Sequence, residues 1–249
     1  MPIGVVSSLS VLRNASSAEP GRHSAAGGSP SWWVGGGKRV FDVVVAGVLG
    51  AVTLPVTLIC AALVGSLDGS PILFRQTRVG RFVREFQILK FRTMRSGQGP
   101  LVTSRGDPRV TPLGRRLRRA KLDELPQIWN VLRGDMSLVG PRPEVPMYVA
   151  ARARDYRAIA GLRPGMTDWA SLLFRDEEAV LRAHASNPGF YEETLLPRKL
   201  ALARLYHRRL SCRVDLSILA ATAGLVLGAR ARGAGGLGPF LAARARDGL

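Results

Sequence analysis

The longest feature in the hydropathy pattern is a nearly continuous apolar stretch over residues 40–67. Its single charge is Asp42, and about 20 such residues are enough for a helix to cross the hydrocarbon core of a bilayer. Pro55 lies near the middle of the stretch and removes one backbone hydrogen bond from that helix. The pattern therefore predicts a membrane-associated helix with a break at Pro55.

Basic residues flank this stretch on both sides. Lys38 and Arg39 precede it, and four arginines follow it within residues 75–84. Because cationic flanks favour the cytoplasmic side, a straight span would carry one of them across the bilayer. A re-entrant helix hairpin over residues 38–68, broken at Pro55, keeps both flanks on one side. A straight transmembrane helix and a buried helix of a soluble protein are the alternatives.

Alternating apolar and polar residues, rich in β-branched and aromatic types, predict strands over residues 71–79 and 85–91 with a hairpin turn between them. Lys90 and Arg92 project from one face of the second strand. Solvated strand edges also carry such cations, so this pattern alone does not assign them a ligand.

A helical period over residues 194–210 places apolar residues mostly on one side: Leu196, Leu200, Ala203, Tyr206 and Leu210. This helix either covers the core of the domain or lies on an anionic membrane surface. A second apolar stretch, residues 216–228, is too short to span a bilayer. It either docks beside the re-entrant helix or packs on the domain.

Composition separates the two ends from the rest of the chain. Residues 1–37 are rich in Ser, Gly and Ala and have no period, which predicts a disordered leader. Residues 231–249 are rich in Gly, Ala and Arg and predict a flexible basic tail. Residues 69–230 carry the remaining signals, so the predicted fold is α+β: a mostly helical, membrane-associated domain with a small β-hairpin or sheet.

The net charge of +18 and a pI near 11.5 call for polyanionic partners, such as nucleic acid, anionic lipid or phosphorylated substrates. No helix-turn-helix or zinc-finger pattern and no RNA-binding aromatic signature is recognisable in the sequence, and nucleic-acid binding would leave the apolar stretch without a purpose. The two cysteines are too few and too far apart for a disulfide framework or a zinc site.

Two adjacent carboxylates, Asp123 and Glu124, directly follow a run of cations that comprises Arg115, Arg116, Arg118, Arg119 and Lys121. Such a pair suits a phosphorylated substrate, because the cations attract phosphate while the carboxylates supply a metal ligand and an attacking oxygen. Pro126 favours the first turn of a helix beginning at Asp123, whose dipole would keep both carboxylates ionised. A solvated helix start is the alternative.

Four motifs in this order are similar to those of the bacterial sugar transferase family, the polyprenyl-phosphate phosphoglycosyl transferases. They are FRQTRVG from Phe74, KFRTM from Lys90, LDELPQ from Leu122 and NVLRGDMSLVGPRPE from Asn130. With the apolar stretch, the resemblance covers roughly residues 38–230. Four ordered motifs are far more specific than a short glycine-rich pattern. The family's larger members carry several N-terminal spans, in whose place this chain has the leader.

The resemblance implies a monotopic enzyme of the bacterial inner membrane whose catalytic domain, residues 69–230, faces the cytoplasm. Asp123 would attack a nucleoside-diphosphate sugar, expected to be a UDP-sugar, releasing UMP and forming an aspartyl-phosphosugar. Polyprenyl phosphate would then accept the phosphosugar as the first membrane step of polysaccharide or glycoconjugate assembly. Glu124 would hold Mg²⁺, while Lys90, Arg118 and Arg142 would bind phosphate.

This chain departs from the family pattern over residues 167–171, a segment associated with recognition of the nucleotide or the sugar, so the resemblance leaves the identity of the sugar open. Two other classes remain as alternatives. A non-catalytic basic membrane adaptor would explain the apolar stretch and the charge, but not the Asp123–Glu124 pair. A nucleic-acid-binding protein would explain the charge alone. The sequence does not specify an oligomeric state.

Overall fold

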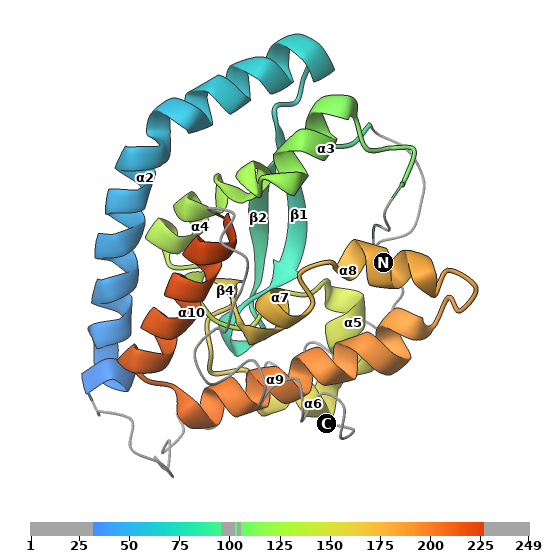
Figure 1. Cartoon of the computed structure of the whole chain (residues 1–249). Helices are drawn as coiled ribbons and strands as arrows, with labels where there is room; N and C mark the ends of the chain where they lie inside the picture. The colour runs from blue at the N-terminus through green and yellow to red at the C-terminus, as the bar shows by residue number, and fades with distance from the viewer. Residues whose placement is uncertain (1–31, 96–102, 104–105, 227–249) are drawn as a thin grey trace.

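The computed structural model describes residues 32–95, 103 and 106–226, and it is mostly helical with two small sheets (Figure 1). In chain order the elements are η1 (Trp33–Gly37), α2 (Lys38–Leu63), η2 (Val64–Asp68), β1 (Leu73–Val79), η3 (Arg81–Val83), β2 (Glu85–Phe91), α3 (Pro112–Arg119), η4 (Leu122–Glu124), α4 (Gln127–Arg133), β3 (Ser137–Val139), α5 (Pro146–Ala151), α6 (Ala153–Arg157), β4 (Gly165–Thr167), α7 (Trp169–Leu173), α8 (Glu177–Ala183), η5 (Tyr191–Leu195), α9 (Leu196–Arg209) and α10 (Cys212–Val226). The α+β class predicted from the sequence is confirmed.

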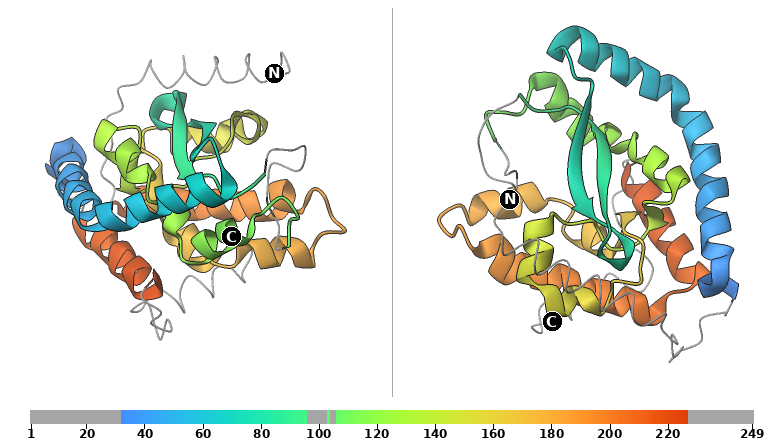
Figure 2. Two further views of the ribbon diagram at one scale, coloured as in Figure 1. Left: turned by 90° about the horizontal axis from the view of Figure 1, so that it is seen from above. Right: turned by 180° about the vertical axis from the view of Figure 1, so that it is seen from behind.

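Helix α2 runs along one side of the molecule and bends between its first and second halves (Figures 1 and 2). Pro55 lies inside the helix, where its ring displaces the preceding turn and its missing N–H leaves a carbonyl free. Thr53 Oγ1 donates to Leu49 O at 2.7 Å, and Thr57 Oγ1 donates to Thr53 O at 2.9 Å, which are bonds that further favour bending. The interruption predicted at Pro55 is therefore a bend in a continuous helix, not a break into two.

Both ends of this helix pack on the same domain. At the first end Trp33 is buried in the main core, and Arg39 donates to the carbonyls of Val131 and Leu132 at the end of α4. At the second end, Cys60 and Val64 are buried in a cluster with Phe91, Leu113 and Leu117. Helical structure begins at Trp33, inside the segment predicted as a leader, while residues 1–31 lie outside the described part.

Between the two ends, the outer side of α2 exposes large apolar side chains: Val44, Val48, Val52, Leu54, Leu58 and Ile59 are each more than half exposed. The continuous helical segment Trp33–Asp68 is long and apolar enough to cross a bilayer by length and composition. An apolar face of this extent has no partner within the described chain, and such faces mark contact with lipid or protein.

Strands β1 and β2 form the antiparallel hairpin that the alternating pattern predicts, with Leu73 opposite Phe91 and Val79 opposite Glu85. The turn closes through Gly80 N–H donating to Arg84 O at 2.7 Å. Inside it Phe82 and Val83 adopt φ of 55° and 58°, a region that favours glycine. Burial of Val83 against Val79 and Val149 offsets that strain.

Helices α9 and α10 pack on the core of the domain, and α10 lies beside α2 (Figure 1). All five apolar residues predicted on one side of α9 are buried, so this helix covers the core and does not present that face to a membrane. Ile218 of α10 is buried in the same core, and Thr222 hydrogen-bonds Thr167 of β4 at 2.7 Å. The short C-terminal apolar stretch therefore packs on the domain, and its first turn also contacts the start of α2.

Candidate functional site

Asp123 and Glu124 lie on η4, a tight turn between two helices. Helix α3 begins with a sound cap, because Thr111 Oγ1 accepts from Gly114 N–H at 2.8 Å and Pro112 takes the first position. Lys121 ends this helical run by adopting φ of 58°, which reverses the chain. The reversal turns the carboxylate pair inward, against β2.

The sequence interpretation of a helix beginning at Asp123 is wrong. Helix α4 begins at Gln127, with Pro126 as its N-terminal cap residue. The N–H group of Leu125 donates to Leu122 O, and that of Ile128 donates to Leu125 O. The helix dipole therefore does not act directly on Asp123, and these N–H groups are not free anion donors.

Glu124 is the centre of a partly buried charge cluster that joins three parts of the chain. Lys90 Nζ from β2 lies 3.1 Å from Glu124 Oε1, and Arg142 Nη2 from the loop after β3 lies 2.5 Å from the same oxygen. The three side chains are 14–32% exposed. Sequence analysis assigned all three to the site, and the fold brings them into direct contact.

This arrangement separates the pKa values of the two carboxyl groups. Burial opposes ionisation of Glu124, but the charges of Arg142 and Lys90 hold its pKa well below the ordinary value. The pKa of Asp123 is instead raised, first by burial and then by the charge of Glu124. The sequence predicts that a helix dipole keeps both carboxyl groups ionised. In the structure, ion pairing favours the ionised form of Glu124, whereas burial and the charge of Glu124 oppose ionisation of Asp123.

Asp123 is the more isolated of the pair. Its side chain belongs to a residue that is 6% exposed, and Oδ1 has no hydrogen-bond partner within the described residues. A buried carboxylate oxygen without a donor is costly, so such a group calls for a functional explanation. The free oxygen is available to react with, or to coordinate, a group that enters the site.

Two glycines hold the loop that carries Arg142. A Cβ on Gly140 would lie 2.4 Å from Arg163 O, and one on Gly165 would lie 2.1 Å from Gly140 N. This close approach allows Gly165 N–H to donate to Pro141 O at 2.9 Å, beside the parallel pair β3–β4. The backbone just before Arg142 is therefore fixed by main-chain contacts that no larger residue would permit.

Glu144 fixes the other side of the same loop, and sequence analysis gave it no role. It is 7% exposed, accepts from Tyr191 OH at 2.6 Å, and lies 3.7 Å from Arg78 Nη1. Arg78 also donates to Pro143 O at 3.1 Å. Its position in the GPRPE motif could have indicated a role for Glu144. Its partner Tyr191 could not be predicted, because it lies 47 residues away along the chain.

Arg118 and Asp135, two other residues near the site in the sequence, contact neighbouring side chains. Arg118 Nη1 lies 3.3 Å from Glu178 Oε1 of α8, and its charge lowers the pKa of Asp123, although the two larger influences named above leave that pKa raised. Asp135 follows Gly134, whose φ of 94° ends α4, and accepts from Asn130 Nδ2 at 3.3 Å. Asn130 also accepts from Leu89 N–H at 3.0 Å, which joins α4 to β2.

The described residues contain no group of three or more His, Cys, Asp or Glu side chains that could form a metal site. Mg²⁺ is commonly held by one or two carboxylates together with substrate phosphates and water. The unpartnered Asp123 Oδ1 and the carboxylate of Glu124 fit that smaller requirement. The adjacent Lys90 and Arg142 would then balance the charge of the phosphates.

Comparison with known proteins gives one family. The profile described as bacterial sugar transferase matches residues 33–229. The chain is 50% identical over 141 residues to a UDP-glucose:undecaprenyl-phosphate glucose-1-phosphate transferase of Caulobacter vibrioides, covering 54% of this chain and 53% of that protein. It is 39% identical over 193 residues to an undecaprenyl-phosphate glucose phosphotransferase of Komagataeibacter xylinus, covering 73% and 34%.

A UDP-N-acetylgalactosamine-undecaprenyl-phosphate N-acetylgalactosaminephosphotransferase of Aeromonas hydrophila is 40% identical over 144 residues, covering 55% of this chain and 34% of that protein. The chain thus spans between a third and about half of the length of these curated relatives. Their names differ in the sugar they specify.

Proposed function

The chain belongs to the bacterial sugar transferase family, and from this we propose that it transfers a phosphosugar from a UDP-sugar to polyprenyl phosphate, giving polyprenyl-diphospho-sugar and UMP. The observation that carries the proposal is the cluster of buried Asp123 with the partly buried side chains of Glu124, Lys90 and Arg142. It combines a bare carboxylate oxygen with two cations that can hold phosphate. An adaptor without catalytic activity would have no use for this arrangement.

The proposed first step is attack by an Asp123 carboxylate oxygen on the phosphorus that bears the sugar. The new O–P bond forms as the bond from that phosphorus to the bridging oxygen breaks, and UMP leaves with the electron pair. Lys90 and Arg142 stabilise charge on the phosphate oxygens, and positioning of this kind accounts for most of the catalysis in phosphoryl transfer. Arg118 lies close enough to influence Asp123 and is assigned the same task.

The second step regenerates the enzyme. A phosphate oxygen of polyprenyl phosphate attacks the same phosphorus, and the bond to Asp123 breaks. Mg²⁺, when bound, would neutralise phosphate charge and act as a Lewis acid. Within the chain, Glu124 would ligate it, and Arg142 and Lys90 would keep Glu124 ionised and oriented.

The arrangement of α2 supports a re-entrant position in the cytoplasmic leaflet of the bacterial inner membrane. The two ends of the helix contact one domain, and the exposed apolar face lies between them. A straight span would place its two ends on opposite sides of the bilayer. The bend at Pro55 offers the geometry for entry and exit on the same face.

Labelling of single cysteines tests this topology. We expect Gly35→Cys and Ser70→Cys, in a chain whose Cys60 and Cys212 are replaced by alanine, to react with a membrane-impermeant maleimide only after cells are permeabilised. Both positions flank the helix, and a side chain at position 35 meets no other atom within 4 Å. Reaction of only one of the two cysteines in intact spheroplasts would show that the helix spans the membrane, and reaction of both would show that the domain faces away from the cytoplasm.

The reaction is tested by UMP release from detergent-purified protein supplied with a panel of UDP-sugars. We expect sustained release to need both polyprenyl phosphate and Mg²⁺, and to fall at least about tenfold on chelation because phosphate charge is then less well neutralised. Restoring Mg²⁺ to the chelated sample is the control for irreversible loss. Folded protein whose UMP release is the same with and without polyprenyl phosphate would contradict the proposed acceptor.

A further inference from the structure

Arg142, which contacts Glu124, also lines a cavity that includes neither Lys90 nor Glu124 among its lining residues. Empty space of about 400 Å³, part of it open solvent, lies within this pocket, and its walls come from the Arg142 loop, α6, α7, α8 and α9. Because Arg142 contributes to both the cavity and the Glu124 cluster, a ligand whose phosphate lies against Arg142 can extend into this space.

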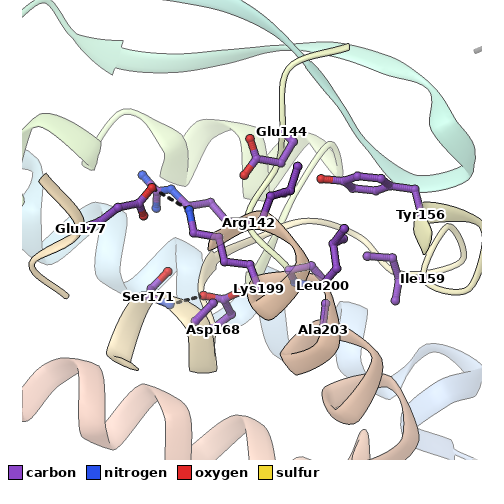
Figure 3. A pocket seen from close by; sticks show the side chains of 13 residues that line it. Arg142, Glu144, Tyr156, Ile159, Asp168, Ser171, Glu177, Lys199, Leu200 and Ala203 are labelled. Atoms are coloured by element: carbon purple, nitrogen blue, oxygen red, sulfur yellow. Dashed lines mark hydrogen bonds and ion pairs between the residues drawn. The ribbon is translucent and has the colours of Figure 1, made fainter. Parts of the chain in front are cut away.

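The walls of the cavity are polar on one side and apolar on another (Figure 3). Asp168, Ser171, Glu177 and Lys199 gather on one side, with Ile159, Leu200 and Ala203 facing them. Lys199 Nζ lies 2.8 Å from Glu177 Oε1, and Asp168 Oδ1 accepts from Ser171 N–H at 2.7 Å. These bonds fix two carboxylates at the rim while leaving each some capacity to accept further hydrogen bonds.

Two hydroxyl groups at the cavity lack partners. Ser171 Oγ and Tyr156 OH are both buried, and neither forms a hydrogen bond with any described residue. Burying a hydroxyl group without a partner is unfavourable, so these two atoms indicate a polar ligand that would complete their bonding. Neither residue takes part in the charge cluster around Glu124.

We propose that this cavity receives the sugar ring of the nucleotide-sugar donor, with Ser171, Tyr156 and Glu177 as residues that determine which sugar is accepted. The inference rests on the proposed function. A sugar ring carries several hydroxyl donors for carboxylate acceptors, and its C–H faces can lie against Ile159, Leu200 and Ala203. This division of polar and apolar contacts matches the cavity wall.

Other parts of the donor fit less well. Three carboxylates line the cavity, those of Glu144, Asp168 and Glu177. Of its two lining cations, Arg142 is assigned to the phosphate that bears the sugar, and Lys199 already faces Glu177. A second phosphate would therefore be repelled. A uracil ring offers a single N–H donor, fewer than this set of acceptors can use.

Removal of the two unpartnered hydroxyl groups is the sharpest test, because neither holds the fold together. Ser171→Ala and Tyr156→Phe are compared with wild type and with the control Ser217→Ala, an exposed serine on α10. The measurements are kcat/KM for UDP-glucose, UDP-galactose and their two N-acetylated counterparts, and the inhibition constant of UMP. Thermal unfolding is followed in the same samples.

We expect each test variant to change the ratio of kcat/KM between donors by about 3- to 10-fold, the effect of one lost hydrogen bond. Inhibition by UMP should remain unchanged, and the unfolding temperature should not fall, because the removed hydroxyl groups have no partner among the described residues of the folded protein. Weaker UMP inhibition with unchanged donor ratios would overturn the proposal by assigning the cavity to the nucleoside, and unchanged kinetics throughout would also overturn it. Wild-type protein that releases no UMP from any donor would overturn the proposed function itself, before any variant is compared.

Discussion

Asp123→Asn is expected to lower phosphosugar transfer by on the order of 10³-fold or more, because the amide cannot act as the attacking oxygen. Wild-type protein mixed with donor alone should release up to one UMP per enzyme as the aspartyl-phosphosugar forms. The variant should release none, and its intact mass should not increase. Full activity in a folded Asp123→Asn variant would exclude the covalent mechanism.

The same substitution is expected to stabilise the fold of the metal-free protein at neutral pH. The folded state raises the pKa of Asp123 through burial and the charge of Glu124, so the folded chain holds this proton more tightly than the unfolded chain does. The ionised carboxylate therefore lowers the free energy of unfolding above the raised pKa. A neutral group of similar shape removes that loss, and we expect a gain of about 0.5–2 kcal/mol, the usual size of a single stabilising substitution.

The sign of the effect fixes its pH dependence. As pH falls towards the ordinary pKa near 3.8, the wild-type carboxyl group becomes protonated and the advantage of Asp123→Asn should disappear. Thermal unfolding at several pH values, in chelator and without donor, measures this. The control is Asp155→Asn, a partly exposed carboxylate paired with Arg204, which should give no stabilisation at neutral pH. A less stable Asp123→Asn at neutral pH would contradict the charge argument.

Short-range features of the fold could be predicted because the residues that determine them are close in sequence. Alternation over residues 85–91 is sufficient for β2, and the helical period after residue 194 correctly assigns the buried side of α9. The site residues Lys90, Glu124 and Arg142 came from motifs, and the structure adds that one oxygen of Glu124 receives both cations.

Features that depend on a single backbone angle or on distant partners could not be predicted. The left-handed conformation of Lys121 ends α3 and moves the start of α4 to Gln127, and no periodicity reveals it. Lys38 and Arg39 have the composition of a membrane flank, yet they bind Asp215 and α4 carbonyls. Glu177 has the pattern of a solvated helix start, and its position at the cavity wall beside Lys199, 22 residues further on, is not evident from the sequence.

Lys38 at the start of α2 forms two ion pairs, one of which joins this helix to α10. Lys38 Nζ lies 2.7 Å from Asp215 Oδ2 and 3.9 Å from Asp42 Oδ1, and both carboxylates are almost fully buried. Tyr206 OH donates to Asp215 Oδ1 at 2.7 Å, and Leu138 N–H donates to Asp42 Oδ1 at 3.1 Å. One lysine thus serves two carboxylates that join α2, α10 and β3.

Lys38→Met should therefore lower the free energy of unfolding by about 3–5 kcal/mol, because it removes the cation that pairs with two buried carboxylates. The loss should be smaller at acid pH. Burial already raises the pKa of Asp215, and removing the lysine raises it further, so proton uptake can neutralise that carboxylate as pH falls. Denaturant unfolding in one detergent at pH 8 and pH 5 measures both effects. The control is Arg154→Met, which removes the charge of an exposed arginine at the surface.

Adding Asp215→Asn to Lys38→Met should recover part of the lost stability, because one uncompensated charge is removed while the amide oxygen can still accept from Tyr206. A double variant less stable than Lys38→Met would show that Asp215 contributes through its charge to a partner other than Lys38. Equal stability of Lys38→Met and Arg154→Met would show that this ion pair does not hold α2. If the predicted order is found, α2 is fixed to α10 and β3 by the same lysine whose position in the sequence predicts a membrane flank.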